Sequence, residues 1–173
     1  MMEVFLLTGG YSKRMTRPKS ELLWRGKTFR DHLLASFPEA KTVGHNEGYE
    51  ADFPDLYLRG SSLQGIVSSL THSTGKRCLI LSCDMPFLEK KHVASLLNAR
   101  GTACFYKDRF LPFPAVYEKK YLEYYKRELK RNQFKLQYIL EKTALSIIPF
   151  PCHPHAFFNI NRKMEYNRFR RYL

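Results

Sequence analysis

One apolar run in the middle of the chain limits the possible folds more than any other segment. Residues 77–83 (RCLILSC) are nearly continuously apolar and show no alternation of polar and apolar positions. Such a run is typical of a strand buried on both faces of a parallel sheet, because helices cover both sides of that kind of sheet. The run ends at Asp84, and Pro86 then interrupts the pattern. We therefore expect an α/β protein in which this segment is a buried middle strand.

The segments on either side of this run alternate between strand-like and helix-like patterns. Short apolar runs predict strands, and apolar residues at helical spacing predict helices. The expected strands are 4–7, 41–43, 56–58, 77–83, 102–105, 112–117 and 145–149. The expected helices are 28–37, 62–72, 90–99, 118–129, 133–142 and 162–173. This order predicts a three-layer α/β/α fold with a mostly parallel sheet, in one domain that covers residues 1–173.

Composition narrows the class of protein without choosing a function. Of the 173 residues 44% are apolar, and no stretch approaches the roughly 20 consecutive apolar residues of a membrane helix. The N-terminus shows no signal-peptide pattern, so we expect a cytoplasmic protein that does not bind a membrane. The cysteines match no zinc or redox spacing, and those in strand-like runs are expected to be small buried hydrophobes. They are Cys78, Cys83, Cys104 and Cys152.

The formal net charge of +13 favours partners that are acidic or rich in phosphate. Nucleic acid, a phosphate-rich small molecule and an acidic protein all fit this charge, and so does a basic surface without a specific partner. A nucleic-acid-binding protein is one alternative, because Tyr166, Phe169 and Tyr172 stand among arginines in the basic segment 162–173. These aromatic residues are also typical of a helix that packs on the sheet, which is the interpretation we favour.

A pair of glycines follows the first expected strand and begins a basic loop. Gly9 and Gly10 allow the backbone to turn sharply and to approach a ligand closely, and consecutive amides in such a loop can point at an anion. Ser12 adds a hydroxyl donor, and a triphosphate needs this mixture of backbone donors and side-chain charge. The loop is neither a Walker A nor a GxGxxG motif, so a simple strand-to-helix turn is the alternative. The nearby cations are Lys13, Arg14, Arg17 and Lys19.

Asp84 follows the buried strand directly, within the sequence SCDMP at 82–86. A carboxylate in that position is well placed to bind a hard cation such as Mg²⁺. Nucleotidyl transfer needs such a metal to neutralise charge on the pyrophosphate leaving group. An aspartate that caps the next turn is the alternative. Because Gly9 and Asp84 both follow expected strands, they are expected at one edge of the sheet, where ligands bind.

The order of these motifs resembles the nucleotidyltransferase superfamily and, within it, the molybdenum cofactor guanylyltransferases. That family combines a first glycine loop, a basic segment, a leucine-x-glycine helix start, a cysteine-aspartate-x-proline and a late asparagine-x-asparagine. The matching segments are LTGG at 7–10, RM at 14–15, Lys19, LL at 22–23, LQG at 63–65, CDMP at 83–86 and FNIN at 158–161. The matches are in order and span nearly the whole chain. The resemblance implies a Rossmann-like nucleotidyltransferase fold.

The resemblance also implies a reaction, in which GMP passes from GTP to molybdopterin and pyrophosphate leaves. GTP and the molybdopterin cofactor would be the substrates, with Mg²⁺ as the metal and transient contacts to cofactor-synthesis or acceptor proteins. The asparagines of the last motif are also typical of turns before a helix. The implied roles are nucleotide contacts from Leu7, Thr8, Gly9 and Gly10, triphosphate binding by Arg14 and Lys19, Mg²⁺ binding by Asp84, and pterin contacts from Asn159 and Asn161.

The chain departs from the family pattern at a few positions. Thr8 stands where alanine is usual, and Thr16 stands where glycine is usual. Arg59 aligns with an acidic residue that contacts the nucleotide in the family. An asparagine of the second strand region aligns near Gly44, with Asn46 two residues later. A related enzyme with the same chemistry and another substrate, such as a sugar phosphate or a cytidylyl donor, is therefore an alternative.

Overall fold

The computed structural model describes residues 2–9, 18–44, 50–57, 61–98, 102–106, 108–144, 146–149 and 154–172. Its main sheet has six strands in the order β4-β1-β5-β7-β6-β8. Within this sheet β7 pairs antiparallel with β5 and β6, whereas the other pairs are parallel. The strands are β1 (Met2–Leu7), β4 (Lys41–Val43), β5 (Arg77–Ser82), β6 (Thr102–Tyr106), β7 (Arg109–Glu118) and β8 (Ser146–Pro149). The expected mostly parallel sheet is confirmed.

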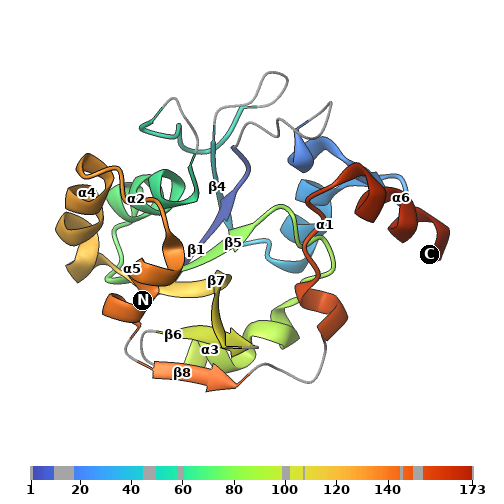
Figure 1. The fold of residues 1–173 in the computed structure, drawn as a ribbon. Coiled ribbons are helices and arrows are strands. Elements are labelled where there is room, and N and C mark those ends of the chain that lie inside the picture. The colour runs from blue at the N-terminus through green and yellow to red at the C-terminus, as the bar shows by residue number, and fades with distance from the viewer. Residues whose placement is uncertain are drawn as a thin grey trace.

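Helices cover both faces of the sheet (Figure 1). On one face lie α2 (Ser62–His72), α4 (Leu122–Lys130) and α5 (Leu136–Thr143), and on the other lie α1 (Phe29–Ser36) and α3 (Ala94–Asn98). Helix α6 (Lys163–Tyr172) follows beside α1. Short 3-10 turns are η1 (Lys19–Glu21), η2 (Lys90–Val93), η3 (Lys119–Tyr121) and η4 (Pro154–Phe157). This is the expected three-layer arrangement, and no described helix is long and apolar enough to cross a membrane.

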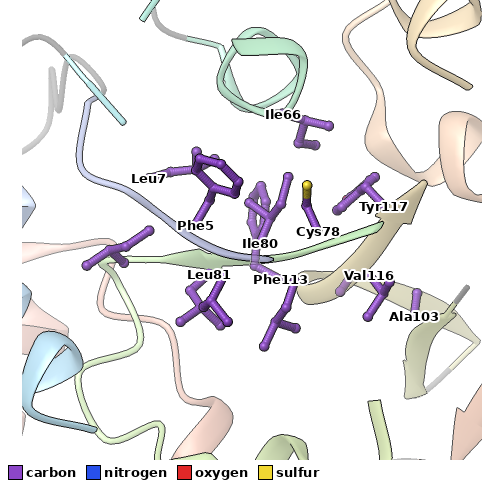
Figure 2. Close-up of a cluster of buried hydrophobic side chains, with 14 of the residues drawn as sticks. Phe5, Leu7, Ile66, Cys78, Ile80, Leu81, Ala103, Phe113, Val116 and Tyr117 are labelled. Atoms are coloured by element: carbon purple, nitrogen blue, oxygen red, sulfur yellow. The ribbon is translucent and has the colours of Figure 1, made fainter. Parts of the chain in front are cut away.

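The apolar run lies at the centre of the core, as predicted. The four side chains from Cys78 to Leu81 in β5 are fully buried. Figure 2 shows Cys78 and Ile80 on the side of the sheet that faces Ile66 of α2, and Leu81 on the other side. Phe5 of β1 pairs with Ile80 and lies on the α2 side as well. The run is apolar at successive positions from Cys78 to Leu81 because both faces of β5 are covered by helices.

The strand expected at 56–58 is wrong for its described residues, Leu56 and Tyr57. The Leu56 N–H donates to Ser68 Oγ at 3.0 Å, and the Tyr57 N–H donates to Asp55 Oδ1 at 3.2 Å. Ser68 Oγ in turn donates to Asp55 Oδ1 at 2.6 Å. Side chains rather than a neighbouring strand therefore satisfy this backbone. The contact with the sheet comes earlier, where Phe53 forms an isolated parallel bridge to the end of β4.

A hairpin between η1 and α1 was not predicted. It consists of β2 (Leu23–Trp24) and β3 (Lys27–Thr28), which pair antiparallel. Its two central residues, Arg25 and Gly26, have φ values of 47° and 78°. Two successive positive φ angles are what a tight two-residue hairpin turn requires. The signal was weak because arginine, unlike asparagine, is uncommon at the first of these positions.

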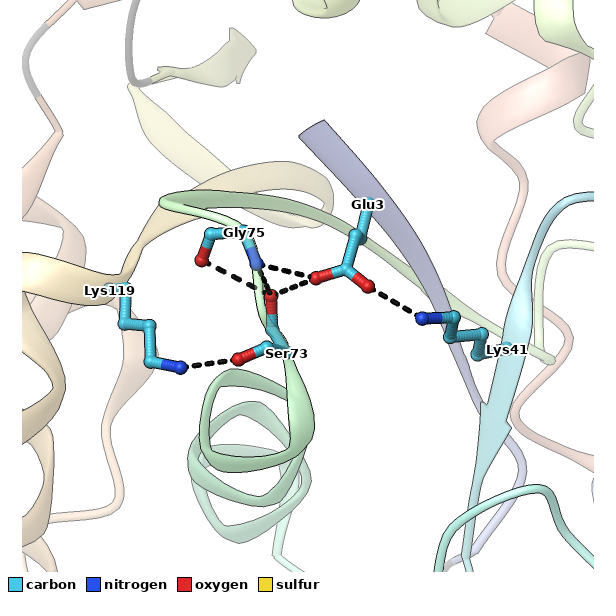
Figure 3. A network of polar contacts seen from close by, with 5 residues as sticks. All are labelled: Glu3, Lys41, Ser73, Gly75 and Lys119. Carbon is cyan, nitrogen blue, oxygen red and sulfur yellow. Dashed lines mark hydrogen bonds and ion pairs between the residues drawn. The ribbon is translucent and has the colours of Figure 1, made fainter. Parts of the chain in front are cut away.

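Glu3, near the start of β1, links the start of β4 to the segment between α2 and β5 at one end of the sheet (Figure 3). Its carboxylate accepts hydrogen bonds from Lys41 Nζ at 2.6 Å, from the Gly75 N–H at 2.8 Å and from Ser73 Oγ. Lys119 Nζ donates to the Ser73 carbonyl and extends the network to the end of β7. Burial raises the pKa of Glu3, but the hydrogen bonds from Lys41, Ser73 and Gly75 outweigh it and lower the pKa to about 2.

Glu3→Gln is expected to lower the free energy of unfolding at pH 7 by about 2–3 kcal/mol, because a depressed pKa stabilises the fold. The folded pKa of about 2 lies below the ordinary value of 4.5, so this stabilisation is present above pH 4.5. It is lost as the pH falls from there toward 2. Urea unfolding of both proteins at several pH values measures it. Glu123→Gln, on the exposed face of α4, is the control with little expected effect on stability. If Glu3→Gln were as stable as the unmodified protein at pH 7, the prediction would be wrong.

Candidate active site

The ends of β1 and β5 lie side by side. The two strands pair in parallel, with Leu7 opposite Ser82, and the Cys83 N–H donates to the Leu7 carbonyl at 3.3 Å. The chain therefore leaves both strands at the same edge of the sheet, into Gly9 after β1 and into Asp84 after β5. The expectation that the glycine loop begins at the edge that carries Asp84 is confirmed.

A cation, a carboxylate and an amide meet at that edge. Lys19 Nζ lies 3.5 Å from Asp84 Oδ2 and donates a hydrogen bond to Asn161 Oδ1. Lys19 begins η1 directly after Pro18, whose φ of −54° is fixed by its ring. The side chains of Lys19 and Asp84 are 21% and 17% exposed, so a ligand can reach both. Residues that are 142 positions apart in the sequence thus share one site.

A small second core holds the asparagine segment against this site. Ile160 is buried and packs with Leu22 and Phe29, with Trp24 among the residues around them. The Ile160 N–H donates to the Asp84 carbonyl at 2.9 Å. The asparagines on either side of Ile160 are therefore fixed beside the loop that follows β5. This core joins the segment after Lys19, helix α1 and the segment before α6.

Two buried oxygens from this region, Asp84 Oδ1 and Asn159 Oδ1, have no hydrogen-bond partner. Buried polar atoms in proteins nearly always have one, and a missing partner is costly. Carboxylate and amide oxygens are ligands that Mg²⁺ accepts, and Mg²⁺ commonly takes only one or two protein ligands beside water and substrate phosphates. The described residues contain no group of three His, Cys, Asp or Glu suited to a metal. The unpartnered oxygen of Asp84 therefore fits a magnesium ion that is held mostly by substrate.

The leucine-x-glycine motif lies in the first turn of α2. Ser61 and Gln64 form a capping box, in which Ser61 Oγ accepts from the Gln64 N–H and Gln64 Oε1 accepts from the Ser61 N–H. A Cβ at Gly65 would lie 3.0 Å from Leu7 Cδ1. Glycine at this position therefore allows the start of α2 to pack closely on the end of β1.

The end of β4 supports the beginning of the glycine loop. The Thr8 N–H donates to the Val43 carbonyl at 2.9 Å, and Thr8 Oγ1 donates to the same oxygen at 3.2 Å. A Cβ on Gly44 would lie 2.7 Å from Thr8 Oγ1 and 2.9 Å from Gly9 Cα, closer than real Cβ atoms approach. Thr8 and Gly44 are thus parts of one packing arrangement.

Cys83 is next to Asp84 but is unsuited to nucleophilic chemistry. It is a buried free cysteine. Burial, together with the neighbouring Asp84 charge, raises the pKa of the thiol to about 12. A thiol with that pKa is protonated at neutral pH and is a poor nucleophile. Cys78 is also buried and free, so the expectation that these cysteines are small buried hydrophobes is confirmed for both.

Comparison with known proteins decides the family. Residues 4–145 match the sequence model of the MobA-like NTP transferase domain. The chain belongs to this family. A probable molybdenum cofactor guanylyltransferase from Clostridium perfringens (strain ATCC 13124) is 30% identical over 182 residues, which cover 93% of this chain and 92% of that protein. One from Flavobacterium johnsoniae is 26% identical over 179 residues, 96% of this chain and 89% of that protein.

The fold of this MobA-like NTP transferase has been seen in solved structures. The crystal structure of molybdopterin-guanine dinucleotide biosynthesis protein A from Archaeoglobus fulgidus superposes with a TM-score of 0.83 and 24% sequence identity. The match covers 99% of this chain and 98% of that one. The predicted family and the Rossmann-like nucleotidyltransferase fold are therefore confirmed.

Some predicted positions of the NTP transferase lie outside the described residues. Gly10, Arg14, Thr16, Asn46 and Arg59 are in this group. The roles expected of them stay predictions.

The sequence interpretation missed Glu165 in the first turn of α6. Glu165 Oε2 accepts hydrogen bonds from the N–H groups of Asn161 and Arg162. Glu165 is the third helical residue after Arg162, which is the place of the glutamate in a capping box, but arginine is not a usual cap residue, so the sequence signal is weak. Tyr166 packs inward, but on Phe29 of α1 and not on the sheet, with ring centroids 6.0 Å apart. The expected packing role of this aromatic side chain is confirmed, and its expected partner was wrong.

Proposed function

We propose that this chain transfers GMP from GTP to molybdopterin, releases pyrophosphate and forms the guanine dinucleotide form of the cofactor. The observation that carries the proposal is the meeting of Lys19, Asp84 and Asn161 at one edge of the sheet. The names of the curated relatives support guanylyl transfer as the reaction. In this proposal residues 1–173 act as one domain, which makes transient contacts with cofactor-synthesis or acceptor proteins.

The nucleotide is bound by the loop after β1 and by the cations that follow it. Backbone groups of residues 7–10 contact the nucleotide, and Arg14 and Lys19 bind the triphosphate. Thr8 supports this assignment because its two bonds to the Val43 carbonyl fix the start of the loop. Lys19 supports it because its ammonium is already held between two oxygen atoms, so little freedom is lost when phosphate binds.

Asp84 holds Mg²⁺ in this proposal, through the buried oxygen that has no other partner. When bound, Mg²⁺ neutralises charge on the phosphates and on the pyrophosphate leaving group. Asp84 Oδ2 remains near Lys19, so the carboxylate also keeps the ammonium in place. The Asp84 side chain thus positions both cations that bind the triphosphate, Mg²⁺ and the Lys19 ammonium.

The acceptor is bound on the side of the site formed by Asn159 and Asn161. The terminal phosphate of molybdopterin attacks the α-phosphorus of GTP, and the bond from that phosphorus to the β-phosphate oxygen breaks. The acceptor phosphate is already ionised at neutral pH, so no side chain has to remove a proton. The chain contributes positioning and charge neutralisation, which together account for most of the catalysis in such transfers.

Calorimetric titration with GTP, CTP and ATP in the presence of Mg²⁺ tests the proposal. GTP is expected to bind with a Kd between about 1 μM and 1 mM, the range in which enzymes usually work with their substrates. CTP and ATP are expected to bind at least about tenfold more weakly. Pyrophosphate release should require both GTP and molybdopterin. Preference for CTP, with transfer to another phosphate ester, would favour the cytidylyl or sugar-phosphate alternative. Binding weaker than millimolar for all three nucleotides would overturn the enzyme function.

A further inference from the structure

We propose that Glu165 is a positioning residue for the transfer reaction and that it acts through Asn161. Glu165 Oε2 accepts a hydrogen bond from the Asn161 N–H at 2.7 Å and another from the Arg162 N–H at 2.9 Å. Asn161 Oδ1 in turn accepts from Lys19 Nζ. The carboxylate of Glu165 therefore fixes the backbone of the residue whose side chain meets the site lysine. This inference rests on the proposed role of Asn161 in binding the acceptor.

The two bonds to Glu165 join a helix cap and the site into one unit. Helix α6 begins after Arg162, whose carbonyl accepts from the Tyr166 N–H at 3.0 Å. A glutamate at the third helical position commonly accepts from the N–H of the cap residue and benefits from the positive end of the helix dipole. Here the same oxygen also accepts from the preceding residue, Asn161. The glutamate of the cap therefore also binds the backbone of Asn161, the residue whose side chain contacts Lys19.

Helix α6 is itself fixed to the segment that carries Lys19. Tyr166 Oη donates to the Leu23 carbonyl at 2.7 Å, and its ring packs edge-on against Phe29. Leu23 begins the hairpin that follows η1, and η1 begins at Lys19. Lys19 and Asn161 are thus connected twice, once through their own side chains and once through the hairpin and α6. Glu165 completes the second connection, because it links α6 to the Asn161 backbone.

Glu165→Ala is expected to lower kcat/KM for molybdopterin about tenfold, the effect of losing hydrogen bonds to one charged group. GTP affinity is expected to stay within about threefold, because Lys19 keeps Asp84 as a partner. Glu165→Gln keeps an accepting oxygen and should restore most of the activity. Met164→Ala changes the neighbouring residue of α6, which is 80% exposed, and is the control with unchanged kinetics. Steady-state pyrophosphate release and GTP calorimetry measure these values, and circular dichroism verifies that each variant is folded.

A double-mutant cycle separates positioning from a general structural role. If Glu165 acts through Asn161, Glu165→Ala should change kcat/KM less than about twofold in the Asn161→Ala background. A full tenfold loss of kcat/KM from Glu165→Ala in the Asn161→Ala background would overturn the inference. So would normal transfer by Glu165→Ala if Asn161→Ala impairs transfer. Parallel losses of GTP affinity and thermal stability in Glu165→Ala would also overturn it. Full activity of Asn161→Ala would instead contradict the proposed role of Asn161, so the two failures are distinguishable.

Discussion

Asp84→Asn is expected to lower the rate of guanylyl transfer by about a hundredfold or more, the usual effect of removing one group that stabilises charge in the transition state. Asp84 brings together a buried Oδ1 without a partner and an Oδ2 near Lys19. Asparagine preserves the shape of the side chain and removes its charge, so the fold should persist while metal affinity falls. The rate of pyrophosphate release, measured over a range of Mg²⁺ concentrations, should show both a lower maximum and a requirement for more Mg²⁺.

The matched control for this variant is Asp108→Asn. Asp108 is exposed in the turn between β6 and β7 and has a φ of 59°, a conformation that aspartate and asparagine both adopt. The same chemical change there should leave transfer and its Mg²⁺ dependence unaltered. If Asp84→Asn kept the Mg²⁺ dependence and most of the activity of the unmodified enzyme, the assignment of Asp84 as the metal ligand would be wrong.

Gly44→Ala is expected to weaken GTP binding by about a hundredfold, because displacement of a binding group by about 1 Å has effects of that size. The new Cβ would meet Thr8 Oγ1 at 2.7 Å and Gly9 Cα at 2.9 Å. The backbone of Gly9 cannot yield as a flexible side chain would, so the loop has to move away from β4. Calorimetric titration with GTP in the presence of Mg²⁺ measures the change in affinity.

Gly26→Ala separates a binding defect from a loss of stability. No atom lies within 4 Å of the position of a Cβ at Gly26, but its φ of 78° disfavours alanine. This variant should be less stable by about 1–2 kcal/mol, the cost of a left-handed conformation for a residue with a Cβ, and should bind GTP normally. Wild-type affinity in Gly44→Ala would show that the start of the glycine loop does not set the nucleotide position.

The architecture could be predicted from local patterns because burial of β5 leaves a direct mark on the sequence. A nearly continuous apolar run such as 77–83 is stable only between two covering layers. The segment at 56–58 has a similar but shorter pattern, and in its described part the side chains of Ser68 and Asp55 accept from the N–H groups of Leu56 and Tyr57. A run of that length cannot distinguish a strand from a coil that packs on a helix.

The site could be located from the sequence, but its contacts could not. Gly9 and Asp84 follow strands, and that alone predicts a shared edge of the sheet. The contact of Lys19 with Asn161 spans 142 positions and depends on the small second core around Ile160, which has no periodic signature. Only the resemblance to a family indicated that these residues belong together. Glu165 was missed because its role depends on that same tertiary contact.

The hydrogen bonds of Glu3 stabilise the end of β1 that lies away from the active site. Glu3 lies at the start of β1, and the glycine loop lies at its other end. The site end contains buried oxygens without partners, which cost stability, whereas the carboxylate of Glu3 has partners on both oxygens. Stability and activity often oppose each other when they depend on the same residues. Here they depend on opposite ends of one strand, so substitutions that adapt the enzyme to new substrates can accumulate at one end while the other end keeps the chain folded.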